Sequence, residues 1–187
     1  MEMPKQFDNL NSRVVDDLKT TLKKSSKVSI AAASFSIYAY EALKEELETV
    51  DEIRFIFTSP TFNYEKASKE KREFYIPKLN RERNLFGSDF EIKLRNQLSQ
   101  KAIAKECANW IRRKACFKTN ISTGALNGFM NVTNEDGKYT YLPFNEFTTT
   151  ELGCERGNNM CPASMRMPSP FADEYLRNFN ELWNNSE

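Results

Sequence analysis

The segment Lys27–Phe57 has the sequence KVSIAAASFSIYAYEALKEELETVDEIRFIF, and its pattern determines the expected fold class. Its first nine residues are mostly small or apolar, as in a buried strand. Ser36 is a suitable N-cap for a helix whose inner residues recur every four positions, namely Ala39, Leu43 and Leu47. A second apolar stretch follows, alternates, and is stopped by Pro60. Strand, helix and strand with short connections predict a βαβ unit with parallel strands and a right-handed crossover.

The flanking sequence adds helices and further strands. Asp8 or Asn9 can cap a first helix whose apolar residues recur every four positions, namely Leu10, Val14, Leu18 and Leu22. Residues 61–87 are charged and irregular, and a long helix is expected from about 88 to 114. Strands are expected at 115–122, 128–134 and 138–144, the last two as a hairpin, with a possible further strand at 159–167. Ser169 and Pro170 would open a terminal helix. These elements predict one α/β domain over residues 1–187, with a mixed, largely parallel sheet flanked by helices.

The composition excludes several kinds of chemistry. The 187 residues contain no histidine, which removes Ser-His-Asp and Cys-His catalysis and histidine metal ligation. The four cysteines form no C-x-x-C pair, so we expect no metal centre. The longest apolar run, Val28–Ala33, is too short to cross a bilayer, and the N-terminus lacks a signal-peptide pattern. We therefore expect a cytoplasmic protein without a membrane partner.

The charges are distributed unevenly along the chain. Residues 66–118 contain 15 Lys/Arg and 6 Asp/Glu, whereas the rest of the chain contains 12 and 20. Such a basic segment favours a polyanionic partner, and in this case DNA bound through its backbone. The candidate DNA-binding residues are Lys78, Arg81, Arg83, Lys101, Lys105, Arg112, Arg113 and Lys114. The alternative is that these side chains only solvate an exposed helix face, and the sequence leaves both interpretations open.

Several long phrases resemble one protein family. They include KVSIAAASFSIYAYEALKEEL, EIRFIFTSPTF, KREFYIPKLNRER, FEIKLRNQLSQKAIAKECANWIRRK and the hairpin that ends in NEFTTTELG. Together they resemble the phospholipase D-like domain found at the N-terminus of bacterial DEAD/DEAH-type helicases, over nearly the whole chain. The resemblance implies a phospholipase D-like fold and a longer parent protein that is an ATP-dependent helicase. No ATP-binding motif occurs in this chain, so ATP and Mg²⁺ would belong to the parent's motor and this chain would need no cofactor.

The resemblance also indicates a lost active site. Active members carry His-x-Lys, a following Asp, and a Gly-Ser-x-Asn-Phe-Thr corner; the histidine attacks phosphorus, and the lysine and asparagine stabilise charge on the phosphoryl oxygens. Laying this pattern on the sequence places Asn127 at the histidine, Phe129 at the lysine, Asn134 near the aspartate and Glu146 at the asparagine. None of these replacements can do the chemistry, so the resemblance implies a catalytically inactive domain.

Two functions follow as expectations. The first is an accessory domain, not itself an enzyme, that binds the DNA backbone, docks on the helicase motor or forms a homodimer. The second is a nuclease or phosphodiesterase with a non-standard site, in which Glu146 and Asp136 would hold a divalent metal.

Overall fold

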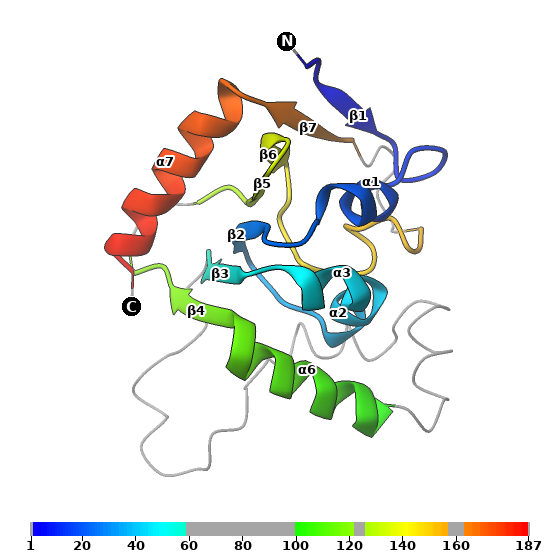
Figure 1. Cartoon of the computed structure of the whole chain (residues 1–187). Helices are drawn as coiled ribbons and strands as arrows, with labels where there is room; N and C mark the ends of the chain where they lie inside the picture. Colours follow the sequence, from blue (N-terminus) through cyan, green and yellow to red (C-terminus); the bar gives the residue numbers. More distant parts are fainter. Residues whose placement is uncertain (1, 59–99, 122–125, 157–162, 187) are drawn as a thin grey trace.

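The computed structural model describes residues 2–58, 100–121, 126–156 and 163–186, which form a seven-stranded sheet and five helices (Figure 1). The strands are β1 (Lys5–Phe7), β2 (Lys27–Ala32), β3 (Glu52–Phe57), β4 (Ala115–Thr119), β5 (Phe129–Asn134), β6 (Gly137–Leu142) and β7 (Ser164–Pro168). The helices are α1 (Val14–Thr21), α2 (Ile37–Ala42), α3 (Lys44–Thr49), α6 (Gln100–Lys114) and α7 (Phe171–Asn184). No helix within these described ranges is both long and apolar enough to cross a membrane.

The sheet is mixed, as expected, but it is mostly antiparallel. Its strand order is β1-β7-β6-β5-β2-β3-β4. Only β2–β3 and β3–β4 are parallel pairs; β2–β5, β5–β6, β6–β7 and β1–β7 are antiparallel. The prediction of a largely parallel sheet was therefore wrong. Parallel neighbours need a crossover connection, which joins β2 to β3, whereas the C-terminal half begins with a hairpin that reverses the chain.

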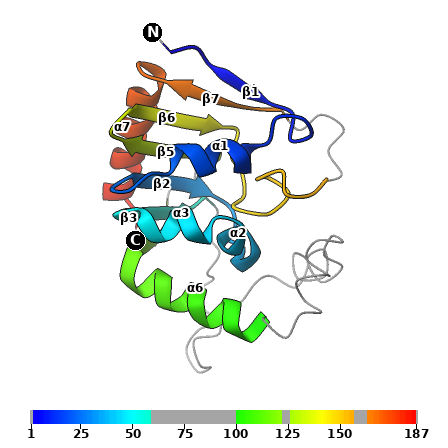
Figure 2. The same ribbon diagram turned by 45° about the vertical axis from the view of Figure 1, so that its right-hand side comes forward.

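The helices lie on both faces of the sheet in unequal numbers. The helices α1, α2, α3 and α6 pack on one face, and α7 lies alone on the other among the described elements (Figures 1 and 2). The first face holds the larger core, which includes Leu18, Phe55, Trp110 and Tyr141. The second core is small and contains Ala31, Ile56, Phe129 and Phe179.

The βαβ unit formed as the sequence predicted. The strands β2 and β3 are parallel neighbours, and the Ser36 side chain accepts a hydrogen bond from the N–H of Tyr38 at 3.2 Å. The expected inner residues of the helical segment, Ala39, Leu43 and Leu47, are all buried. The segment is divided at Leu43 into α2 and α3, which share the same inner face.

The N-terminal prediction was wrong in two respects. Helix α1 begins at Val14 rather than near Asn9, and Leu10 is 56% exposed. Asp8 does not cap this helix; its carboxylate accepts three backbone N–H groups of residues 10–12 and so closes a preceding turn. Asn9 Oδ1 accepts from Val14 N–H at 3.0 Å, which ties that turn to the helix. The turn leads the chain from β1, a strand that the sequence analysis did not predict.

The C-terminal elements agree with the prediction except at their ends. The strands β5 and β6 form the expected hairpin, and Asn134 Oδ1 accepts the N–H groups of Asp136 and Gly137 in the turn. Strand β7 lies between β1 and β6. Pro170, rather than Ser169, is the N-cap of α7. The expected irregular segment and the start of the helix expected from residue 88 lie outside the described residues.

Candidate functional site

The two parts of the candidate motif meet at one end of the sheet. The N–H of Phe144 donates to the carbonyl of Gly128 at 2.9 Å, and the N–H of Gly128 donates to Asn145 Oδ1 at 3.4 Å. The chain leaving β2 joins the same place, since Ala33 N–H donates to the Asn145 carbonyl at 2.7 Å. The residues that adjoin this contact are Asn127 and Glu146, which the resemblance places at the histidine and asparagine positions. The fold therefore joins the two segments in which these positions lie, although 18 residues of chain separate Asn127 from Glu146.

Close backbone packing explains the glycine at this meeting point. A Cβ added to Gly128 would lie 2.2 Å from the carbonyl oxygen of Phe144 and 2.5 Å from the Cα of Asn145. Both atoms belong to the main chain, so no side-chain rotation could relieve the clash. Phe144 is fully buried at this point and helps to fix the segment in place.

The side chains at the motif positions differ from the histidine, lysine and asparagine that the phospholipase D-like pattern requires. Asn127 and Glu146 are exposed, and neither is a basic nucleophile or a cation. Phe129 is only 5% exposed, because its ring packs edge-on against Tyr175 of α7 with centroids 5.2 Å apart. Asn134 lies at the opposite end of β5, where its amide donates to the carbonyl of Thr21 at 2.7 Å. Asn134 is therefore a turn residue and is not part of the meeting point.

The metal pair considered from the sequence is not brought together. Asp136 lies in the β5–β6 turn and pairs with Lys23, whereas Glu146 follows the far end of β6. The six residues of β6 separate the two carboxylates by roughly 20 Å. Within the part of the chain that the structure describes, no group of three or more His, Cys, Asp or Glu residues could hold a metal ion.

Carboxylates nevertheless surround the meeting point. Glu151 Oε1 accepts the N–H of Asn145 at 2.9 Å. Burial raises the pKa of Glu151, with a further contribution from the charge of nearby Glu146. Glu155 accepts the hydroxyl groups of Thr149 at 2.6 Å and Thr150 at 3.1 Å. These described carboxylates do not favour a bound phosphate at this end of the sheet.

The predicted DNA-binding cations divide into three groups. Lys78, Arg81 and Arg83 lie outside the described residues, as does the side chain of Lys101. On α6, Arg113 pairs with Glu48 at 2.9 Å, and Lys114 donates to the carbonyl of Val50 at 2.8 Å. Lys105 and Arg112 are exposed on the same helix, and Arg112 contacts only Asn109, at 3.0 Å, within the described residues.

The face of α6 whose cations lack an acidic partner, among the described residues, is therefore narrower than the sequence predicted. Positions 105, 109 and 112 follow the helical spacing and share one face. On the neighbouring face of α6, charged residues form ion pairs with α3: Glu106 pairs with Lys44, and Arg113 pairs with Glu48. Lys105 and Arg112 are the two described cations of α6 that remain available to a polyanion.

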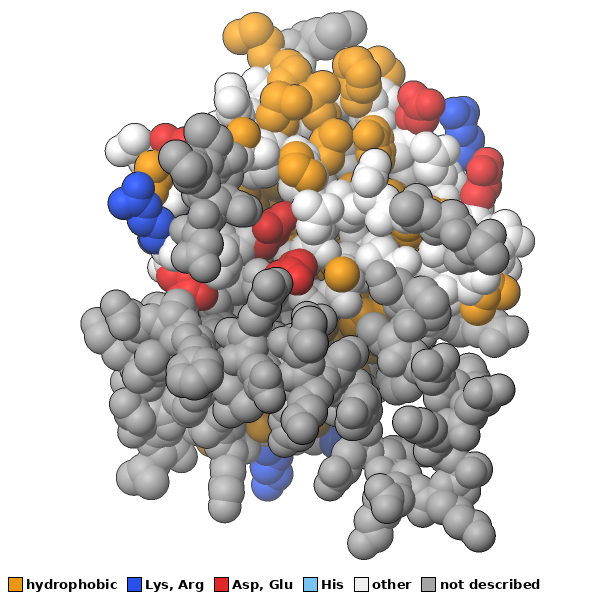
Figure 3. Space-filling view, turned by 180° about the vertical axis from the view of Figure 1, so that it is seen from behind, with side chains coloured by type: hydrophobic (Ala, Val, Ile, Leu, Met, Phe, Trp, Pro, Cys, Tyr) orange, Lys and Arg blue, Asp and Glu red, His pale blue; other side chains and the backbone are white. Residues whose placement is uncertain are grey.

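An apolar patch lies at the other end of the molecule from α6. The large hydrophobic side chains of Met3, Met165 and Phe171 are 81%, 40% and 55% exposed. They come from the chain before β1, from β7 and from the start of α7, where Figure 3 shows hydrophobic side chains gathered at the top of the view. The patch and the α6 cations are thus separate surfaces.

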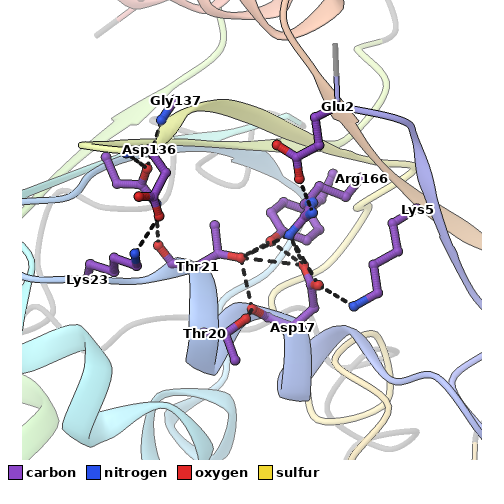
Figure 4. Close-up of polar contacts among 11 residues, drawn as sticks. Glu2, Lys5, Asp17, Thr20, Thr21, Lys23, Asp136, Gly137 and Arg166 are labelled. Carbon is purple, nitrogen blue, oxygen red and sulfur yellow. Dashed lines mark hydrogen bonds and ion pairs between the residues drawn. The ribbon is translucent and has the colours of Figure 1, made fainter.

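A buried ionic network lies beneath α1 (Figure 4). The Asp17 side chain is 2% exposed and accepts from Lys5 at 2.7 Å, from Arg166 at 3.2 Å and from the Tyr141 hydroxyl at 2.7 Å. Thr21 accepts from the same hydroxyl at 3.1 Å. Burial, then the charge of Asp17, raise the pKa of Tyr141 well above its ordinary value. The network fastens β1, β6 and β7 to α1.

Sequence reasoning missed this network, although one signal was present. Asp17 occupies the inner stripe of α1, three residues after Val14 and one before Leu18, both of which are fully buried. A carboxylate on a buried helix stripe indicates a buried partner. Its partner Arg166 lies 149 residues away, and no local pattern identifies that residue.

Comparison with known proteins gives no family for this chain. No protein-family model matches it, and no match was found among curated proteins. The resemblance to phospholipase D-like domains stays a prediction from the sequence.

Proposed function

We propose that this chain is a catalytically inactive phospholipase D-like accessory domain of an ATP-dependent DEAD/DEAH-type DNA helicase, which contacts the DNA backbone and docks on the motor. The observation that carries the proposal is the backbone contact of Gly128 with Phe144 and Asn145. It joins the two segments that would supply the halves of such an active site. The positions beside it hold Asn127 and Glu146 instead of histidine and asparagine.

The loss of activity follows from the chemistry of these side chains. A carboxamide such as Asn127 cannot form a phosphoenzyme, and Glu146 adds negative charge where a phosphate would sit. The lysine position holds Phe129, whose ring is buried against α7. Purified protein incubated with plasmid and labelled oligonucleotides, with and without Mg²⁺ or Mn²⁺, should leave the substrates intact. Cleavage that disappears in a Glu146→Ala variant would instead support the nuclease alternative.

The proposed DNA contact uses the exposed cations of α6. Lys105 and Arg112 would each neutralise a backbone phosphate, so binding to duplex DNA should weaken steeply as salt is raised. We expect a Lys105→Glu/Arg112→Glu variant to bind a labelled duplex at least about tenfold more weakly than the parent, with a smaller salt slope. Fluorescence anisotropy over a salt series measures both quantities.

A matched control separates this effect from net charge. Lys19 and Lys24 are exposed at and after the end of α1, so a Lys19→Glu/Lys24→Glu variant makes the same change of charge elsewhere. It should bind the duplex much as the parent does. Equal losses for the two double variants would mean that α6 is only a solvated helix face.

A further inference from the structure

The sheet face beneath α7 carries a row of buried polar side chains. Ser29, Asn131 and Thr140 are neighbours across β2, β5 and β6. All three are buried, with exposures of 2% or less. Within the described part of the chain, neither the nitrogen nor the oxygen of the Asn131 amide has a hydrogen-bond partner, and the Thr140 hydroxyl has none. Buried polar groups without partners cost free energy. Covering this row therefore makes the packing of α7 on the sheet less favourable.

The same face carries cations that α7 holds through its aromatic rings. The Arg54 guanidinium lies over the ring of Phe179 at 5.1 Å and over Trp183 at 5.6 Å. Lys118 lies over Trp183 at 5.2 Å and donates to the carbonyl groups of Trp183 and Ser186, each at 2.8 Å. At the other end of α7, Lys138 pairs with Asp173 at 2.6 Å.

An aromatic ring completes the surface. Phe129 lies on the same face as Asn131, two residues along β5, and is covered edge-on by Tyr175 and Phe179 at 5.2 and 6.4 Å. Among the described residues, Ala31 and Ile56 of the sheet are also fully buried in this core. The partly buried residues that pack against it are Leu126, Leu142, Tyr175, Leu182 and Trp183.

We propose that α7 is a displaceable cover over a binding surface for single-stranded nucleic acid on this sheet face. Each contact of α7 has a counterpart in such a ligand. Aromatic bases would replace Tyr175 and Phe179 against Phe129, and phosphate oxygens would replace the helix carbonyl groups that Lys118 binds. The Asn131 amide and the Thr140 hydroxyl, which α7 leaves without partners, would hydrogen-bond the edges of unpaired bases. The surface is distinct from α6, so the proposal does not depend on duplex binding there.

The ligand is single-stranded because of the geometry of the surface. A flat sheet face with one ring offers a stacking platform only to bases that are not already stacked and paired. Duplex DNA presents its phosphates outward and its bases inward, and α6 rather than this face suits it. The test therefore compares oligo(dT), oligo(U) and a duplex of the same length.

The first experiment loosens α7 in the full chain. An Asp173→Asn/Trp183→Ala variant removes the ion pair with Lys138 and the indole ring that makes cation–π contacts with Arg54 and Lys118. Fluorescence anisotropy should show oligo(dT) and oligo(U) bound at least tenfold more tightly than by the parent, with duplex binding unchanged. A Glu174→Gln/Arg177→Gln control, on the exposed face of α7, should bind as the parent does. A loosened α7 without tighter single-strand binding would overturn the proposal.

The second experiment tests the polar row. Asn131→Leu replaces the amide with an apolar side chain of similar size, so the urea midpoint of the full chain should stay the same or rise. Added to the loosened variant, the same substitution should remove the gain in single-strand binding. A fall in the midpoint would show that the amide has a partner in the closed fold, and the proposal would then fail.

The third measurement needs no variant and covers the case in which the loosened chain fails to fold. Native-state hydrogen exchange of the parent should show the amides of α7 opening locally, faster than those of β2 and β3. Oligo(dT) should increase the exchange of α7, because the ligand stabilises the open state. Exchange of α7 only at the rate of β2, with no response to oligo(dT), would overturn the proposal.

Discussion

Each face of the sheet buries a polar cluster, and the two clusters differ in the partners that they find. Beneath α1, the carboxylate of Asp17 meets two cations and a hydroxyl, so that each charge has a partner. Beneath α7, the side chains of Asn131 and Thr140 are as deeply buried and have no partner. The first face is closed by specific long-range contacts, whereas the second is closed mainly by a few rings. The difference indicates which helix is a fixed part of the fold and which one can leave it.

The largest expected effect comes from breaking the ionic network. Asp17→Asn removes the charge that Arg166 faces, and the Arg166 side chain is only 15% exposed. Arg166 would lose its buried partner and keep only its pair with the half-exposed Glu2, at 2.6 Å, among the described residues. We therefore expect a loss of up to about 3–5 kcal/mol in the free energy of unfolding. Urea titration followed by circular dichroism measures this loss.

The neighbouring residue provides a control for that substitution. Asp16 pairs with Arg13 at 2.7 Å, but both side chains are about half exposed. Asp16→Asn should therefore cost less than about 1 kcal/mol. If the two variants lose similar amounts, the network beneath α1 is not what fastens this face.

A pair of threonines compares the faces directly. Thr21 donates to the Asp17 carbonyl at 2.9 Å and accepts from Tyr141, so Thr21→Val should lower the free energy of unfolding by about 1–2 kcal/mol. Thr140 has no partner, so Thr140→Val should leave the value unchanged or raise it by up to about 1 kcal/mol. Urea midpoints of the two variants, measured side by side, decide the matter. A greater loss for Thr140→Val would remove the contrast between the faces.

The smallest effect concerns a carboxylate that has no cation. Burial raises the pKa of Glu151 above its ordinary value of 4.5, so the folded chain holds this proton more tightly than the unfolded chain does. Stability is therefore lost as pH rises from the unfolded value through the folded one. Glu151→Gln keeps an acceptor for the Asn145 N–H without the charge.

The expected outcome for this variant depends on pH. At about pH 7 Glu151→Gln should be the more stable protein, and below about pH 4, where Glu151 is neutral, the two should agree. Urea titrations at both pH values test this. A parent that is more stable than the variant at neutral pH would mean that the carboxylate is favourably solvated or paired.

The elements that the sequence predicted correctly depend on local patterns. The βαβ unit from Lys27 to Phe57 and the hairpin of β5 and β6 follow from apolar periodicity and turn residues within a few positions of one another. The assignment of Asn127 and Glu146 to motif positions stays a prediction. What failed was pairing at a distance. The antiparallel pairing of β2 with β5 joins strands far apart in the sequence, and β1 pairs with β7, which is more than 150 residues further along the chain.

The candidate site divides in the same way. The sequence predicted the basic character of α6, but it did not reveal that Arg113 and Lys114 are used in packing against Glu48 and Val50. It gave no indication that Asn131 and Thr140 lie side by side beneath a helix. Such facts depend on which surfaces meet, and a pattern along one segment does not contain them.

The sequence by itself determined the helical and strand segments and the absence of imidazole, because periodicity and residue type are local properties of the chain. Only the tertiary structure decided the order and direction of the strands, the partners of Asp17, and which polar groups remain without partners beneath α7. These are decided by contacts between distant residues, whose burial and hydrogen bonding exist only when the sheet and its two covering layers are assembled.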